Sequence, residues 1–131
     1  PANAFVANFI GMTNFLDAQV VGPNSINIGG TRITVQCKDF AKGDEICVAA
    51  RPEAIEILSK GTKNSFEGKV VDMEFLGSFV RLHIKTSLSS NNYLLADTPM
   101  TENFDTSVSL NAKINFTLSS KLLNIYKHEA A

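Results

Sequence analysis

The 131-residue chain has no tryptophan, only two cysteines and two histidines, and no long apolar run. Cys37 and Cys47 cannot build a disulfide framework, and the widely separated His83 and His128 do not complete a zinc motif with them. We expect two plain thiols, with a disulfide across a hairpin as the alternative. The apolar runs are too short for a transmembrane helix.

The chain also lacks an excess of charge of either sign. Twelve Lys and Arg residues and thirteen Asp and Glu residues leave a net charge of -1. Nucleic-acid binding draws most of its affinity from phosphate neutralisation, so this balance disfavours a nucleic-acid partner. The composition, 44% hydrophobic and 19% charged, is typical of a soluble globular domain.

Motifs for nucleotide and acyl chemistry are missing as well. The sequence has no G-x-x-x-x-G-K-[ST], no G-x-G-x-x-G and no G-x-S-x-G. We therefore expect no catalytic residue, no cofactor, no metal and no ATP hydrolysis by this chain alone.

The ionisable residues of the middle region favour a solvated surface over catalysis. His83 lies on the polar side of an alternating run and is flanked by two basic residues. Asp72 and Glu74 are expected on one strand face and Glu67 on the other, because side chains alternate along a strand. Neither group has an evident catalytic partner in the sequence.

The opening segment NAFVANFIG has apolar residues at helical spacing, with Asn3 available as a cap and Gly11 as a stop. It predicts a short N-terminal helix. A chain that opens at Pro1 without an initiator methionine is expected to be a piece of a longer protein.

After this segment the hydrophobic period changes to two, which indicates strands. SINI and TRITVQC are joined through Gly29-Gly30 and predict a hairpin. SFEGKVVDMEFLG and SFVRLHIKT are joined at Leu76-Gly77-Ser78, and YLLAD and AKINFTL follow as shorter strands. Gly68 inside a strand indicates a bulge or a tight bend. Roughly eight to ten short strands predict an all-β barrel or sandwich.

Arg51-Pro52-Glu53 interrupts this alternation with two opposite charges around a residue that cannot donate to a sheet. The triplet is either a catalytic ion pair or a corner. Spacing favours the corner, since Pro52 pushes Arg51 towards extended geometry and the chain leaves again in a new strand. We expect Arg51 and Glu53 to anchor it through charge-assisted hydrogen bonds.

Most of the nine phenylalanines lie at apolar-periodic positions, which favours core packing over a base-stacking platform. Phe75 and Phe79 bracket the Gly77 corner. If both are exposed, they are candidates for a protein interface.

Three stretches carry a resemblance to a known family: FVANFIGMTN, VAARPEAIEI and FEGKVVDMEFLGSFVRLHI. In this order and spacing they resemble the TOBE domain, the transport-associated OB-like module behind the nucleotide-binding domain of ABC importer ATPases. The motif residues that match are Gly11, Asn14, Arg51, Pro52, Glu53, Gly68 and Gly77. From Ser87 on, the sequence departs from the family pattern.

The resemblance implies an OB-like β-barrel over residues 14–131, with residues 1–13 as the linker and exit helix from a missing nucleotide-binding domain. It implies a non-catalytic regulatory and dimerisation domain of an importer of spermidine, ferric iron, phosphonate or sugar. The implied partners are a second copy, the nucleotide-binding domain of the same parent chain and membrane permease subunits. The implied location is the cytoplasm, peripheral to the inner face of the membrane through the transporter complex.

Two other functions stay open on the sequence. One is a sensor of small oxyanions, which backbone amides with Arg or Lys side chains would bind. The other is a single-stranded nucleic-acid OB module, which the slightly acidic charge balance disfavours.

Overall fold

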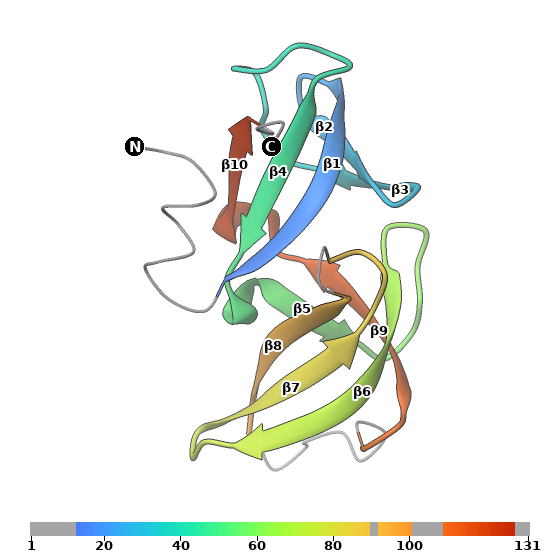
Figure 1. Ribbon diagram of the computed structural model, residues 1–131, viewed down its shortest axis with the longest axis vertical. Helices are drawn as coiled ribbons and strands as arrows, with labels where there is room; N and C mark the ends of the chain where they lie inside the picture. The colour runs from blue at the N-terminus through green and yellow to red at the C-terminus, as the bar shows by residue number, and fades with distance from the viewer. Residues whose placement is uncertain (1–12, 90–91, 101–108, 128–131) are drawn as a thin grey trace.

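A computed structural model of the chain describes residues 13–89, 92–100 and 109–127, and its strands form two antiparallel sheets of five (Figure 1). In the first sheet the strand order is β10-β4-β1-β2-β3. Its strands are β1 (Asn14–Gly22), β2 (Ser25–Ile28), β3 (Thr31–Thr34), β4 (Glu45–Ala50) and β10 (Leu123–Lys127).

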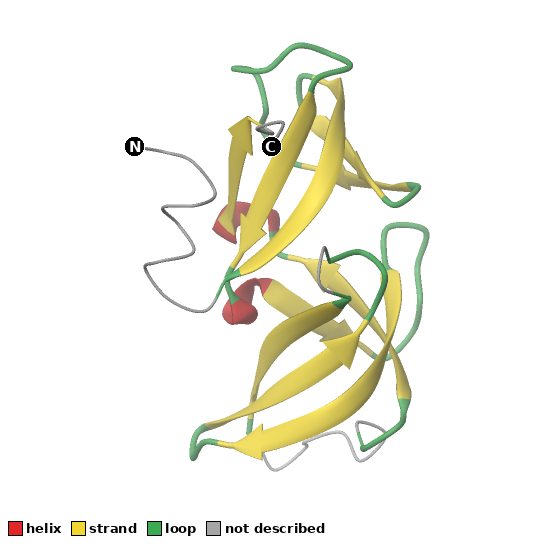
Figure 2. Ribbon diagram, in the orientation of Figure 1, coloured by secondary structure: helices red, strands yellow, loops and turns green. Residues whose placement is uncertain are grey.

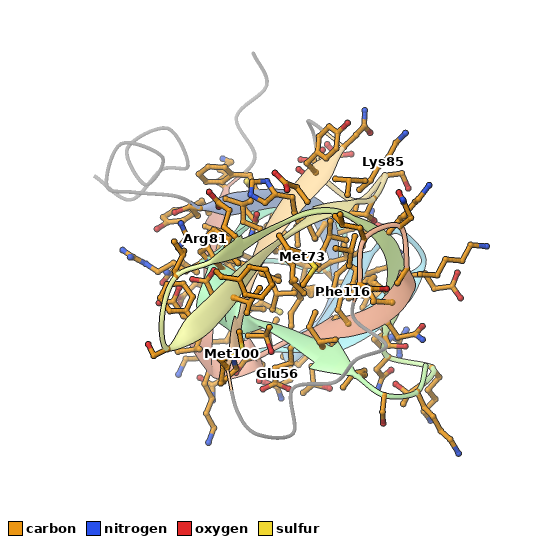
Figure 3. The ribbon with its side chains drawn as sticks, turned by 90° about the horizontal axis from the view of Figure 1, so that it is seen from below. Glu56, Met73, Arg81, Lys85, Met100 and Phe116 are labelled. Atoms are coloured by element: carbon orange, nitrogen blue, oxygen red, sulfur yellow. The ribbon has the colours of Figure 1, made fainter. Side chains whose placement is uncertain are left out.

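The second sheet has the order β5-β9-β6-β7-β8 and curls until β8 also contacts β5. Figure 3 views this sheet from below, with Met73 and Phe116 inside the ring of strands. Its strands are β5 (Ile55–Leu58), β6 (Phe66–Phe75), β7 (Phe79–Lys85), β8 (Tyr93–Pro99) and β9 (Lys113–Leu118).

Helical structure within the described ranges is limited to two 3₁₀ turns, η1 (Pro52–Ala54) and η2 (Ser120–Leu122) (Figure 2). No helix in this part of the chain is long and apolar enough to cross a membrane. The expected helix over residues 3–11, with Gly11 as its stop, lies outside the described residues, as does nearly all of the expected linker over residues 1–13. The all-β prediction is confirmed.

Alternation explains why the strands form where they do. In β7 the side chains of Val80, Leu82 and Ile84 are fully buried, while Lys85 is exposed and the residues between them are half-buried. In β1 the even-numbered residues from Asn14 to Val20 are buried and Asp17 is exposed. Each strand therefore turns one apolar face inward, as the period-two pattern predicts.

Glycines close two of the hairpins. Gly29 has φ 56° and Gly30 has φ 90°, which is the left-handed pair that a two-residue turn between β2 and β3 requires. Gly77 has φ 88° between β6 and β7. Both predicted hairpins are confirmed.

One irregularity in β6 changes which residues share a face. The register with β7 slips between Val70 and Asp72, so the bulge lies beyond Gly68. Gly68 serves a close approach instead, since a Cβ there would lie 2.3 Å from Cγ2 of Ile84. The expectation that Glu67 faces away from Asp72 and Glu74 is wrong, because the extra residue brings all three to the outer face.

Strand β10 was not predicted from the sequence. It follows η2 and pairs antiparallel with β4, with Ile125 opposite Val48. The strand is only five residues long, and its partner lies more than seventy residues earlier in the chain. Both ends of the described chain therefore contribute to the first sheet.

A single buried cluster joins the two sheets. Side chains from β1 and β4, such as Leu16 and Ile46, belong to the same core as Ile55, Leu82 and Phe116 of the second sheet. Phe116 stacks on Phe66 with ring centroids 5.6 Å apart. The two sheets thus share one hydrophobic core.

The side chain of Asn14 connects the sheets through backbone hydrogen bonds. Its Nδ2 donates to the Leu95 carbonyl at 2.8 Å, and the Leu95 N–H donates to Asn14 Oδ1 at 2.8 Å. Asn14 is 6% exposed, and Leu95 belongs to the edge strand β8. One amide side chain thus satisfies two backbone groups that the sheet leaves unpaired.

We expect Asn14→Ala to lower the free energy of unfolding by about 1–3 kcal/mol, because both Leu95 groups lose their partner at a buried site. Urea titration measures the loss. The matched control is Gln19→Ala, which removes an exposed side chain from the same strand and should change stability by less than about 0.5 kcal/mol. Equal losses in the two variants would contradict this role for Asn14.

Candidate functional site

The Arg-Pro-Glu triplet forms the corner between the sheets. Pro52 and Ala54 are buried, while Arg51 and Glu53 are exposed. The Ala54 N–H donates to the Arg51 carbonyl at 2.8 Å, and the Ile55 N–H donates to the Pro52 carbonyl. Within the described ranges neither charged side chain forms a hydrogen bond or ion pair, so backbone bonds and burial hold the turn instead of the expected charge-assisted bonds.

Two ion pairs lie on the outer face of the second sheet. Arg81 Nε lies 2.8 Å from Asp97 Oδ1, and its Nη2 lies 3.0 Å from Asp97 Oδ2. The hydrogen bond to Asp97 raises the pKa of Arg81. The Phe79 ring lies below this guanidinium, with its centroid 5.7 Å from Cζ. This fork-to-fork geometry fixes Arg81 in place.

His83 lies on the same face, half-buried, with Nε2 3.0 Å from Glu74 Oε2. Its polar placement agrees with the alternation of β7. Among the described residues, no group of three or more His, Cys, Asp and Glu is arranged to hold a metal ion. The Arg81–Asp97 and His83–Glu74 pairs hold their side chains in place, which can fix the shape and charge of the outer face of the second sheet.

The β6–β7 corner ends in an apolar tip, defined here as Phe75, Leu76, Phe79 and Met100. Phe75 is 65% exposed, Leu76 45% and Met100 38%, while Phe79 is half-buried. The Met100 N–H donates to the Ser78 carbonyl at 2.9 Å, which places the end of β8 against the corner. The sequence indicated the two phenylalanines only. Leu76 lies within the turn and Met100 follows the end of β8, so no local pattern joined them.

Both cysteines are free and buried, as expected of plain thiols. The Cys37 Sγ donates to the Gly22 carbonyl at 3.0 Å. Cys47 lies between Asp17 and Tyr126 on neighbouring strands. Burial, with a further contribution from the Asp17 carboxylate, raises the pKa of the Cys47 thiol to about 11.

The raised pKa of Cys47 predicts a loss of stability in alkali. Well below pH 9.0 the thiol is protonated in both states, but as the pH rises through 9.0 towards about 11 the unfolded chain releases a proton that the folded chain keeps. The free energy of unfolding should therefore fall across this window.

Urea titrations at several pH values, with Cys47→Ala as the variant, measure this fall. The variant should lose part of the slope, whereas Cys37→Ala, which keeps Cys47, should retain it. Identical slopes for the native chain and Cys47→Ala would show that the thiol is not protected.

Comparison with known proteins shows which family this chain is similar to. Residues 48–109 match the family model of the TOBE domain. The chain is 37% identical over 86 residues to the spermidine/putrescine import ATP-binding protein PotA of Mesomycoplasma hyopneumoniae, covering 65% of this chain and 19% of that protein. It is 33% identical over 100 residues to PotA of Clostridium acetobutylicum, covering 75% of this chain and 27% of that protein.

A third relative, PotA 1 of Pseudomonas aeruginosa, is 30% identical over 105 residues, covering 76% of this chain and 28% of that protein. The matched segment is thus less than a third of the length of these relatives. Among solved structures, the fold is similar to the cytoplasmic molybdate-binding protein ModG with molybdate bound. The TM-score is 0.69 at 11% identity, covering 88% of this chain and 96% of that chain.

Proposed function

We propose, from the premise that this chain belongs to the TOBE domains of ABC importer ATP-binding subunits, that it is the C-terminal regulatory domain of an importer of spermidine or putrescine. The observation that carries this proposal is the 30 to 37% identity to three ATP-binding proteins that share this import activity in their names. The chain covers only part of each relative, so the rest of the parent protein would supply the ATPase.

The structure supports a role in assembly. Two charge pairs are fixed on the outer face of the second sheet, and the most exposed of the large apolar side chains, Phe75, lies at the tip. In this proposal residues 14–131 make up the OB-like domain, and the closing of the second sheet, where β8 curls back to contact β5, supports the barrel. The proposed partners are a second copy, the nucleotide-binding domain of the parent chain and the permease subunits, at the cytoplasmic face of the membrane.

The apolar tip is the proposed contact between two copies. An exposed Phe75 beside Leu76 and Met100 leaves apolar surface that a monomer rarely keeps open. Phe79 is held below the Arg81 guanidinium, so part of the patch is already rigid. A rigid apolar centre with a charged rim is typical of protein interfaces.

We expect the purified chain to sediment as a dimer and to release no phosphate from ATP. The double variant Phe75→Ser, Leu76→Ser should shift the equilibrium to monomer, while Leu122→Ser, which removes another exposed leucine, should not. Sedimentation equilibrium over a range of concentrations measures both. A native chain that stays monomeric at the highest concentration would overturn the dimerisation role.

The importer assignment has its own test, since the coding sequence upstream of Pro1 should specify a P-loop domain. Deletion of residues 14–127 from that parent protein should then alter spermidine uptake in whole cells. Upstream sequence without a G-x-x-x-x-G-K-[ST] motif would contradict the assignment.

An oxyanion sensor is a second candidate, favoured by the likeness of the fold to ModG. Calorimetric titration with molybdate, sulfate and phosphate separates the two candidates. A sensor would give saturable heat with at least one anion, whereas heat with none of them would leave only the assembly role.

A further inference from the structure

A groove lies between the two edges of the first sheet, with one wall formed by the segment 34–40, which begins at the end of β3, and the other by the segment 120–125, which includes η2 and the start of β10. It consists of two adjoining hollows of about 500 and 220 Å³ that share Val35, Gln36 and Leu123 as lining residues. Neither the proposed dimer contact nor the corner at Pro52 uses this groove. Its two walls come from opposite edges of the same sheet.

One wall offers unpaired backbone groups. In the described residues β3 pairs only with β2, and the Val35 and Cys37 N–H groups donate to Asn24 and Pro23 carbonyls at 3.0 Å. Backbone groups point to opposite sides at successive residues of a strand. The peptide groups of Thr34 and Gln36 therefore face away from β2, towards the groove.

The other wall, formed by β10, also offers unpaired backbone groups. The Val20 N–H donates to the Asp44 carbonyl at 2.9 Å, so even-numbered residues of β4 direct their backbone groups to β1 and odd-numbered ones to β10. Cys47 and Ala49 lie opposite Tyr126 and Asn124 of β10. The backbone groups of the alternate residues of β10, Leu123, Ile125 and Lys127, consequently face away from β4.

The floor and the rim of the groove differ in character. Phe40, Leu123 and Ile125 are half-buried and pack against the core, so they form an apolar floor. Lys38 and Lys121 are exposed on the two walls, with Asp39 as the one acidic lining residue. The rim thus carries a net positive charge.

We propose that this groove binds an extended acidic segment of a partner protein by strand addition to β10. The main chain of the segment would pair with the free backbone groups at Leu123 and Ile125. Alternate apolar side chains would lie on the floor, and carboxylates would face Lys38 and Lys121. Because the groove has a wall on each side, it favours binding of one extended strand over pairing with a second whole sheet.

The edge itself supports this use. Exposed strand edges are usually blocked by proline, by a bulge or by a covering loop. β10 contains no proline, and its register with β4 is continuous over all five residues. The edge strand β8 of the second sheet is closed at Leu95 by the Asn14 side chain, so the edges of β8 and β10 differ.

The probe for the test is a synthetic peptide of alternating glutamate and valine, labelled with fluorescein. Anisotropy should show saturable binding, and amide NMR shifts should change in residues 34–40 and 120–127. The double variant Lys38→Glu, Lys121→Glu should bind about tenfold more weakly. The matched control Lys60→Glu, Lys63→Glu, on the exposed loop before β6, should bind as the native chain does.

A second measurement separates strand addition from charge attraction alone. Two peptides are made, one methylated on the odd-numbered backbone nitrogens and one on the even-numbered nitrogens. These are the two phases, and only one of them blocks the amides that face β10. One phase should lose binding and the other should keep it. Equal binding in both phases, shifts outside the two segments, or no binding at all would overturn the proposal.

Discussion

The structure depends on the way one side chain closes the edge of the second sheet. Asn14 accepts from the Leu95 N–H and donates to the Leu95 carbonyl, and both bonds are 2.8 Å long at a site that is almost fully buried. Without this amide, β8 would have an open edge beside the core. Together with the shared core, the bonds make the two sheets one body instead of two weakly joined units.

Because the two sheets form one body, the two candidate binding surfaces are held apart at fixed positions. The β6–β7 tip lies at one end of the molecule, and β10 and β3 lie in the other sheet (Figure 1). The tip has exposed apolar side chains, while the groove has free backbone groups and lysines. In the proposed role, the domain would contact a second copy at the tip and an extended segment at the groove without changing its own fold.

The sequence predicted those elements whose pattern is local. Alternation in β1 and β7 and the glycine pair at Gly29 were sufficient for strands and hairpins. The bulge after Val70 has no turn residue to mark it, so the placing of Glu67 was wrong. Strand β10 depends on a partner distant in the chain, and the groove needs both walls. The Arg51 side chain is exposed because other residues of the turn take the buried positions. The alternation pattern of the sequence does not specify which residues of the turn are buried.

Native-state hydrogen exchange at the Leu95 amide tests the unity of the two sheets most directly. If Asn14 holds the sheets in one cooperative unit, this amide exchanges only through global unfolding, with the same opening free energy as the amide of Leu82 in the centre of β7. Exchange of Leu95 at much lower opening free energy, while Leu82 stays protected, would show that the edge of β8 opens alone and that the sheets are separate units.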